Sequence, residues 1–157
     1  MVIPNCQQEI YNIQTSSSGS AANNNYVINF NTPLKDVVRV ELVTASIPCN
    51  TSNIVYIEVD ELRSQFNDFS NASAGTLSAA VSSPLRNVFG VVYNDDTGTK
   101  DRITYYNRYP ILVEFMYPLR RLEKLSIKLY NNNTLLLDDQ GENYFTFRVI
   151  CNRKNLC

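Results

Sequence analysis

Short runs in which apolar and polar residues alternate dominate this chain, and they constrain its fold more than any other feature. In Glu123–Tyr130, Leu125, Ile127 and Leu129 alternate with polar residues, and Tyr144–Cys151 repeats the pattern with aromatic residues. A strand with one buried face has this period of two, whereas an amphipathic helix repeats every 3.6 residues. No segment shows a convincing helical period, so the sequence predicts an all-β protein.

Turn-forming residues separate these runs at the spacing of a compact antiparallel protein. Short strands spaced in this way are typical of a β-sandwich or barrel. Eight strands suggest a single jelly roll, in which two sheets are built from two Greek keys, although the pattern alone leaves other all-β folds open. We expect strands at Tyr26–Asn31, Val37–Ile47, Ile54–Asp60, Val88–Tyr93, Arg102–Tyr106, Ile111–Tyr117, Glu123–Tyr130 and Tyr144–Cys151.

The chain divides by composition into an N-terminal arm with a polar linker (1–25), a jelly-roll domain (26–151) and a short C-terminal tail (152–157). Gln14–Asn25 is a low-complexity polar stretch that cannot bury a core, while Glu9–Ile13 alternates weakly and could form a strand. The arm is therefore either a disordered tail or a segment that docks on a neighbouring protein. Its apolar anchors would be Ile3, Ile10, Tyr11 and Ile13.

Composition excludes several classes of function. The 14 basic and 15 acidic residues give a net charge of −1, which excludes nucleic-acid binding by bulk positive charge. The chain has no histidine, so serine–histidine and cysteine–histidine catalysis and histidine metal sites are excluded. Only 18% of the residues are charged, which suits a protein that contacts other proteins over much of its surface. We expect no enzymatic activity and no cofactor.

The N-terminus lacks the basic start and apolar run of a signal peptide, and no stretch reaches the roughly 20 apolar residues of a membrane helix. We therefore expect the protein in the cytosol or in a particle assembled there, with no membrane-spanning segment. The acidic pairs Asp95-Asp96 and Asp138-Asp139 leave open a calcium-dependent hydrolase. The four cysteines, Cys6, Cys49, Cys151 and Cys157, are either free thiols or partners in a late disulfide.

Four stretches in a fixed order carry a resemblance to a known family. They are VVRVELVTASIPCNTSN (Val37–Asn53), YIEVDELRSQF (Tyr56–Phe66), YPLRRLEKLSIKLY (Tyr117–Tyr130) and DDQGENYFTFRVI (Asp138–Ile150). Together they resemble the small single jelly-roll penton and minor capsid proteins of large icosahedral DNA viruses. The resemblance covers about Tyr26 to Ile150 and implies a jelly roll that acts by protein–protein assembly.

The resemblance implies a structural virion protein of a double-stranded DNA virus, assembled in the host cytoplasm. Its most direct form is the penton at the fivefold vertices, which contacts sister copies in a pentamer, the major capsid protein and other minor capsid proteins. The first alternative is a minor capsid protein beneath or between the major capsomers. The alternative from another class is a lectin-like β-sandwich that binds carbohydrate through surface aromatic residues.

Two groups of residues are candidates for the interfaces. Tyrosine combines a large apolar ring with a polar tip and is favoured at interfaces, and Tyr105, Tyr106 and Tyr109 are bunched around an expected turn. If eight strands alternate in direction, one end of the sandwich also collects basic residues together with two of the cysteines, which could approach each other and Cys6 of the arm. That end would hold Arg120, Arg121, Arg153, Lys154, Cys49 and Cys151, and the long Glu61–Arg86 loop would lie at the opposite end.

Overall fold

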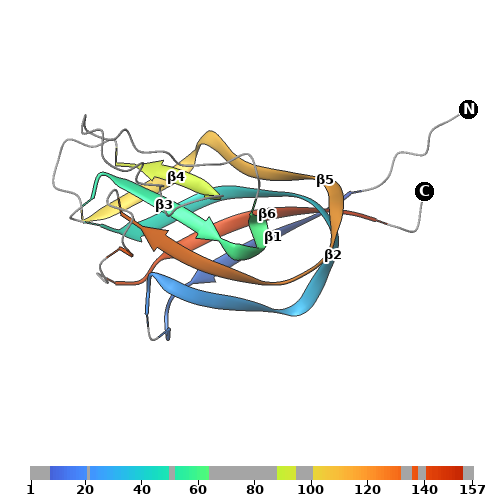
Figure 1. Ribbon diagram of the computed structural model, residues 1–157, viewed down its shortest axis with the longest axis horizontal. Coiled ribbons are helices and arrows are strands. Elements are labelled where there is room, and N and C mark those ends of the chain that lie inside the picture. The colour runs from blue at the N-terminus through green and yellow to red at the C-terminus, as the bar shows by residue number, and fades with distance from the viewer. Residues whose placement is uncertain are drawn as a thin grey trace, which may run out of the picture.

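The computed structural model of this protein describes residues 8–20, 22–49, 52–63, 88–94, 101–131, 136–137 and 141–153, except for the side chain of Arg108. These residues form a curled antiparallel sheet with a single 3₁₀ turn, η1 (Asp60–Leu62) (Figure 1). The expected all-β class is confirmed. The six strands, hydrogen-bonded in the order β1-β6-β2-β5-β3-β4, are β1 (Gln8–Ser16), β2 (Asn25–Pro48), β3 (Ile54–Val59), β4 (Gly90–Tyr93), β5 (Arg102–Tyr130) and β6 (Tyr144–Asn152).

Two long strands replace five of the expected shorter ones. The runs at 26–31 and 37–47 are continuous in β2, and those at 102–106, 111–117 and 123–130 are continuous in β5. The dipeptide Thr32-Pro33 does not end β2, because the fixed φ of proline is compatible with extended backbone. The β2–β5 register also shifts between Asn29 and Leu34, so the N–H that Pro33 lacks falls where no ladder bond is needed.

Both long strands run out along the molecule and turn back at the same end, which we call the bend end (Figure 1). We name residues 25–35 and 37–48 the first and second arms of β2, which meet at Asp36, a residue with a positive φ of 53°. Residues 102–117 and 119–130 are the first and second arms of β5, which meet at Pro118. This folding back curls the sheet into a half-barrel around one core.

The core lies between the arms and holds the residues that the alternation predicted. Leu125, Ile127 and Leu129 are buried on β5, and the β6 residues Phe145 and Phe147 are buried with their rings stacked at a centroid distance of 5.9 Å. Gly90 opens β4 for a close neighbour: a Cβ atom there would lie 2.3 Å from Cγ2 of Ile111. The glycine at the start of this short strand is thus required by packing.

One expected reversal of the chain is absent. The sequence predicts a turn between Tyr106 and Ile111, but both residues belong to the first arm of β5 and pair with Thr44 and Leu42 of β2, respectively. Residues 107–110 are accommodated as a bulge, in which Asn107 has a positive φ of 41°, a conformation that asparagine tolerates. Because this reversal is missing, β6 runs opposite to the direction expected for it.

Residues 14–16, expected in the polar linker, belong to β1, which pairs in register with the whole of β6 from Gln8↔Asn152 to Ser16↔Tyr144. The connection to β2 therefore begins only at Ser17. We call the end of the molecule at which β1 stops and β6 starts the clasp end; it lies opposite the bend end. The long loop expected at Glu61–Arg86 lies largely outside the described residues, which stop at Arg63 and resume at Val88.

Candidate assembly surface

Large exposed apolar side chains gather on the first arm of β5. This arm pairs with β2 on one side, and no strand of the described ranges pairs with its other side. Four of its side chains are largely exposed: Tyr106 (66%), Tyr109 (57%), Met116 (85%) and Tyr117 (82%). We call these four residues the aromatic edge. A free sheet edge that carries large aromatic and methionine side chains has the composition of a protein–protein contact.

Two of these tyrosines lie at the bulge: Tyr106 directly precedes it, and Tyr109 lies within it. Tyr105, just before the bulge, is buried and donates a hydrogen bond from its hydroxyl group to the backbone oxygen of Tyr109. Burial raises the pKa of Tyr105, so its hydroxyl keeps the proton that it donates. Of the three tyrosines predicted as interface residues, Tyr105 therefore supports the bulge from inside, Tyr106 is exposed beside it and Tyr109 is exposed on it.

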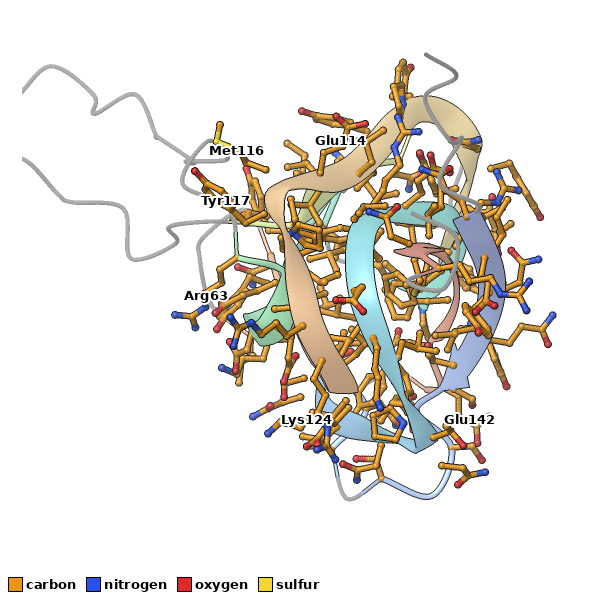
Figure 2. All side chains as sticks on the ribbon, turned by 90° about the vertical axis from the view of Figure 1, so that its right-hand side faces the viewer. Arg63, Glu114, Met116, Tyr117, Lys124 and Glu142 are labelled. Carbon is orange, nitrogen blue, oxygen red and sulfur yellow. The ribbon has the colours of Figure 1, made fainter. Side chains whose placement is uncertain are left out.

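The sequence pattern did not reveal Met116 and Tyr117, the other half of the aromatic edge. The alternation places Tyr117 inward with Ile111 and Val113, and only the latter two are buried. Met116 and Tyr117 lie beside Pro118, where β5 turns from one arm to the other, and Figure 2 shows their side chains at the periphery of the molecule near the bend end. A bend takes the last residues of a strand out of the pleat, so alternation fails there. The proline after Tyr117 was the available signal.

The predicted anchors of the arm lie on β1 at the opposite side of the same sheet. Ile10 is 60% exposed, Tyr11 is exposed, and Ile13 is half-buried against the core. Tyr11 donates a hydrogen bond of 2.7 Å to Glu9, and that bond is the largest cause of the raised pKa of Tyr11. In this single chain β1 docks on its own β6. Ile3 lies outside the described residues.

The basic residues assigned to one end are only partly tested. Arg120 and Arg121 lie in β5 beside Pro118, and Arg153 follows β6, so all three are at the bend end. Arg121 forms an ion pair with Glu123, and Arg153 forms one with Glu9 at 3.4 Å. These acidic partners reduce the positive potential that this end can offer to an acidic surface. Lys154 lies outside the described residues.

The prediction that Cys49 and Cys151 share an end is wrong. Cys151 pairs with Val37 at the bend end, whereas Cys49 follows Pro48, the last residue of β2, at the clasp end. At about 3.3 Å per residue, the twelve residues from Val37 to Cys49 separate the two thiols by roughly 40 Å along β2, far beyond disulfide reach. The missing reversal in β5 is the cause. Both are buried free thiols, and Cys6 and Cys157 lie outside the described residues.

Burial governs the chemistry of Cys151. It raises the thiol pKa to about 11, with smaller contributions from the negative charges of Glu9 and Asp36. The thiol is therefore protonated at neutral pH and a poor nucleophile. Cys49 instead donates a hydrogen bond of 3.1 Å to the backbone oxygen of Ser52. Neither described cysteine resembles a reactive site.

A charged cluster that the sequence did not reveal surrounds η1. Arg63 contacts both Glu58 and Asp60, at 2.9 and 2.7 Å, and Lys128 lies 3.2 Å from Asp60. Burial by itself would raise the pKa of Asp60, but the hydrogen bonds from Arg63 and Lys128 lower it overall. Burial and nearby Glu58 raise the pKa of Tyr130 to about 12. These charges satisfy one another, so the cluster fastens η1 to β5.

Within the described ranges, no group of histidine, cysteine or acidic side chains is arranged to hold a metal ion. The acidic pairs at 95–96 and 138–139 lie outside those ranges. No helix among the described residues combines the length and apolar character needed to cross a membrane. No known protein family matches the sequence, and no curated protein matches it.

Proposed function

We propose that this chain is a structural capsid protein, a single jelly roll that forms the penton of a large icosahedral double-stranded DNA virus. It would act by assembly with sister copies and with the major capsid protein and other minor capsid proteins. A minor capsid protein beneath or between the major capsomers is the alternative position. The pattern of strand pairing is the observation that carries the proposal.

The pairing supports a jelly roll once the arms of β2 and β5 are counted as separate strands. Along the chain, the eight strands are then β1, the two arms of β2, β3, β4, the two arms of β5, and β6. One sheet has the order β1, β6, second arm of β2, first arm of β5, which are strands 1, 8, 3 and 6. The other has the order first arm of β2, second arm of β5, β3, β4, which are strands 2, 7, 4 and 5. Two sheets of four strands in this order are the arrangement that two Greek keys produce. The strand at 8–16 is then the first strand of the fold. The count of eight strands is therefore reached without the turn that the sequence predicted at 107–110.

The exposed surface supports assembly. The aromatic edge and β1 lie at the two opposite edges of the set β1-β6-β2-β5. A contact that joins two different patches of the same molecule is heterologous, and it forms a closed ring when the rotation between copies closes. A fivefold ring needs a contact of this kind, and the chain offers one apolar edge for one side of it.

The first test is the mass of the purified full-length chain in solution, measured by light scattering across a concentration series. We expect a discrete pentamer. A protein that stays monomeric at all concentrations would overturn the self-associating penton and favour the minor capsid protein. Binding of the isolated chain to a glycan array would instead favour the lectin-like alternative.

A second variant set tests whether the aromatic edge forms the contact. The double substitution Tyr106→Ser and Tyr117→Ser should reduce the pentamer to monomers without altering the folded state, because both side chains are largely exposed. Tyr93→Ser on β4 is the matched control, since it removes another exposed tyrosine away from this edge. A pentamer that survives the double substitution would exclude the aromatic edge as the interface.

A further inference from the structure

We propose that β1 is exchanged between copies, so that in the assembled protein the outer edge of β6 is occupied by β1 of a neighbouring copy. The inference rests on the proposed self-assembly of the chain, but it does not depend on the number of copies. It concerns which copy supplies this strand. Three observations carry it: the shallow burial of β1, the division of contacts at Asn143, and the slack in the connection to β2.

The strand β1 is held mainly by its backbone. It packs almost only against β6, and Thr15 is its one buried residue. Ile13 contributes a half-buried side chain to the core, and Ile10 is mostly exposed. A strand attached in this way loses little buried apolar area when it separates from β6. It loses ladder hydrogen bonds, which are restored when an identical strand takes its place.

Asn143, just before β6, contacts both the strand that would be exchanged, β1, and the residues that would remain in place before β2. Its backbone faces β1: the Ser17 N–H donates to the Asn143 oxygen at 3.0 Å, and the Asn143 N–H donates to Ser17 Oγ at 2.8 Å. Its side chain faces β2: Nδ2 donates to the backbone oxygen of Asn23 at 2.6 Å and to Oδ1 of Asn24 at 3.0 Å. The Ser17 bonds would therefore be restored by the neighbour's Ser17, and the Asn23 and Asn24 bonds would remain within the chain.

The hinge lies between these two sets of contacts, in the connection from Ser17 to Asn24. The closed form bends there through Gly19, whose φ is +80°, a conformation that favours glycine. Among the described residues, the bonds that hold this bend include a turn bond of 3.0 Å from the Ser20 N–H to the Ser17 oxygen and a side-chain bond of 2.9 Å from Ser17 to Asn23. Neither bond involves the apolar core, so their loss leaves the packing of the core unchanged.

The connection is longer than the closed form needs. Both Ser17 and Asn24 bond to the same residue, Asn143, whereas eight extended residues reach roughly 26 Å. The surplus length lets β1 extend to another copy. Because β1 and the edge of β6 already match residue by residue, a second copy of β1 is the occupant that fits this edge. Exchange of an identical element is a low-cost route to oligomers.

Disulfide trapping at a native cysteine tests the exchange in the full-length chain. Glu9 pairs directly with Cys151, and opposite residues of an antiparallel pair have Cα atoms about 4.5 to 5.5 Å apart, within disulfide range. The variant Glu9→Cys is made with Cys6→Ser and Cys157→Ser to remove competing thiols, and it is oxidised and run on a non-reducing gel. Ile10→Cys in the same background is the control, because its partner is Ile150.

Exchange predicts that the isolated oligomer of the Glu9→Cys variant is linked between chains and runs as a covalent multimer, whereas the Ile10→Cys control runs as single chains. Links confined within single chains of an oligomer would overturn the exchange and leave the proposed assembly intact. A protein that is only monomeric with internal links would overturn both. Interchain links in a dimer would support the exchange and contradict the fivefold proposal.

Hinge-length variants give a second, independent readout. Deletion of Ser18 to Ala21 removes Gly19 and the bend that it makes in the closed form, and a short, strained hinge favours exchange. We therefore expect an obligate oligomer in which the Glu9→Cys link forms only between chains. Insertion of six Gly and Ser residues after Gly19 should shift the population toward closed monomers with internal links. A deletion variant that remains a folded monomer would contradict the proposal.

Discussion

Strands β1 and β6 are the same length and pair one residue to one, yet they depend on different interactions. Along β6, exposed or half-buried residues alternate with fully buried ones, including Phe145, Phe147 and Val149. Along β1 only Thr15 is buried. A ladder of backbone hydrogen bonds is available to both strands, but only β6 lies between two neighbouring strands and over the core. The comparison separates what fixes a strand in a sheet from what stabilises the fold.

The largest expected difference lies across one register pair, Ile13 on β1 and Phe147 on β6. Phe147→Ala should lower the free energy of unfolding by about 3–5 kcal/mol, the usual loss for a fully buried phenylalanine. Ile13→Ala should cost roughly 1 kcal/mol, because the side chain is only half-buried. Urea unfolding of each variant measures both losses. Equal losses would show that β1 belongs to the core as fully as β6 does.

This contrast also explains what could be read from the sequence. The strand β6 was predictable because its inward residues are all apolar and its outward residues are mostly polar. On β1 the inward series runs Glu9, Tyr11, Ile13 and Thr15, so the period of two is weak, and only 9–13 stood out. An edge strand with little burial leaves little apolar pattern in the sequence.

Connectivity was less predictable than strand content. Thr32-Pro33 and the residues around Asn107 resemble turns, and whether such a segment reverses the chain or only bends it depends on the strands that pair on either side. The turn expected in β5 reversed the direction predicted for β6, and this placed Cys151 at the wrong end of the molecule. Met116 and Tyr117 of the aromatic edge were missed for a related reason. The alternation of apolar and polar residues does not indicate where a strand bends out of the sheet.

The thiol of Cys151 reports on how firmly β1 covers β6. With its pKa raised from 9.0 to about 11, the folded thiol should hold roughly 100-fold less thiolate at pH 8 and react correspondingly slowly with iodoacetamide. Because the folded pKa is the higher one, this residue's contribution to stability is complete below pH 9 and is lost as the pH rises through 11.

Removal of residues 1–16 should increase the labelling rate of Cys151 by about an order of magnitude or more, since burial is the main cause of the shift. The rate is measured by labelling a variant that keeps only Cys151, with and without residues 1–16. In the chain that keeps its native cysteines, Cys49 lies at the opposite end and serves as the internal control. An unchanged rate after truncation would show that β1 does not shield this thiol.

Asn143 should matter less than Phe147 but more than any polar residue on β1. Asn143→Ala removes two hydrogen bonds from its side chain and leaves the buried Oδ1 of Asn24 with one donor fewer. We expect a loss of about 1–3 kcal/mol in the free energy of unfolding. Asn12→Ala, at an exposed position on β1, should change it by less than about 0.5 kcal/mol. Chemical denaturation of the two variants shows whether Asn143 or the polar side chains of β1 contribute more to stability at this edge of the sheet.

The smallest effect on the free energy of unfolding is expected from the ion pair between Glu9, near the start of β1, and Arg153, the residue after β6. Glu9 and Arg153 lie 3.4 Å apart with both side chains largely in solvent, and exposed pairs contribute about 0–1 kcal/mol. Glu9→Gln should therefore change the free energy of unfolding by less than about 0.5 kcal/mol, and added salt should remove even that difference. A loss above 1 kcal/mol that persists in high salt would mean that charge, in addition to the backbone ladder, anchors β1. In that case exchange between copies would require the same pair to form again with a neighbouring chain.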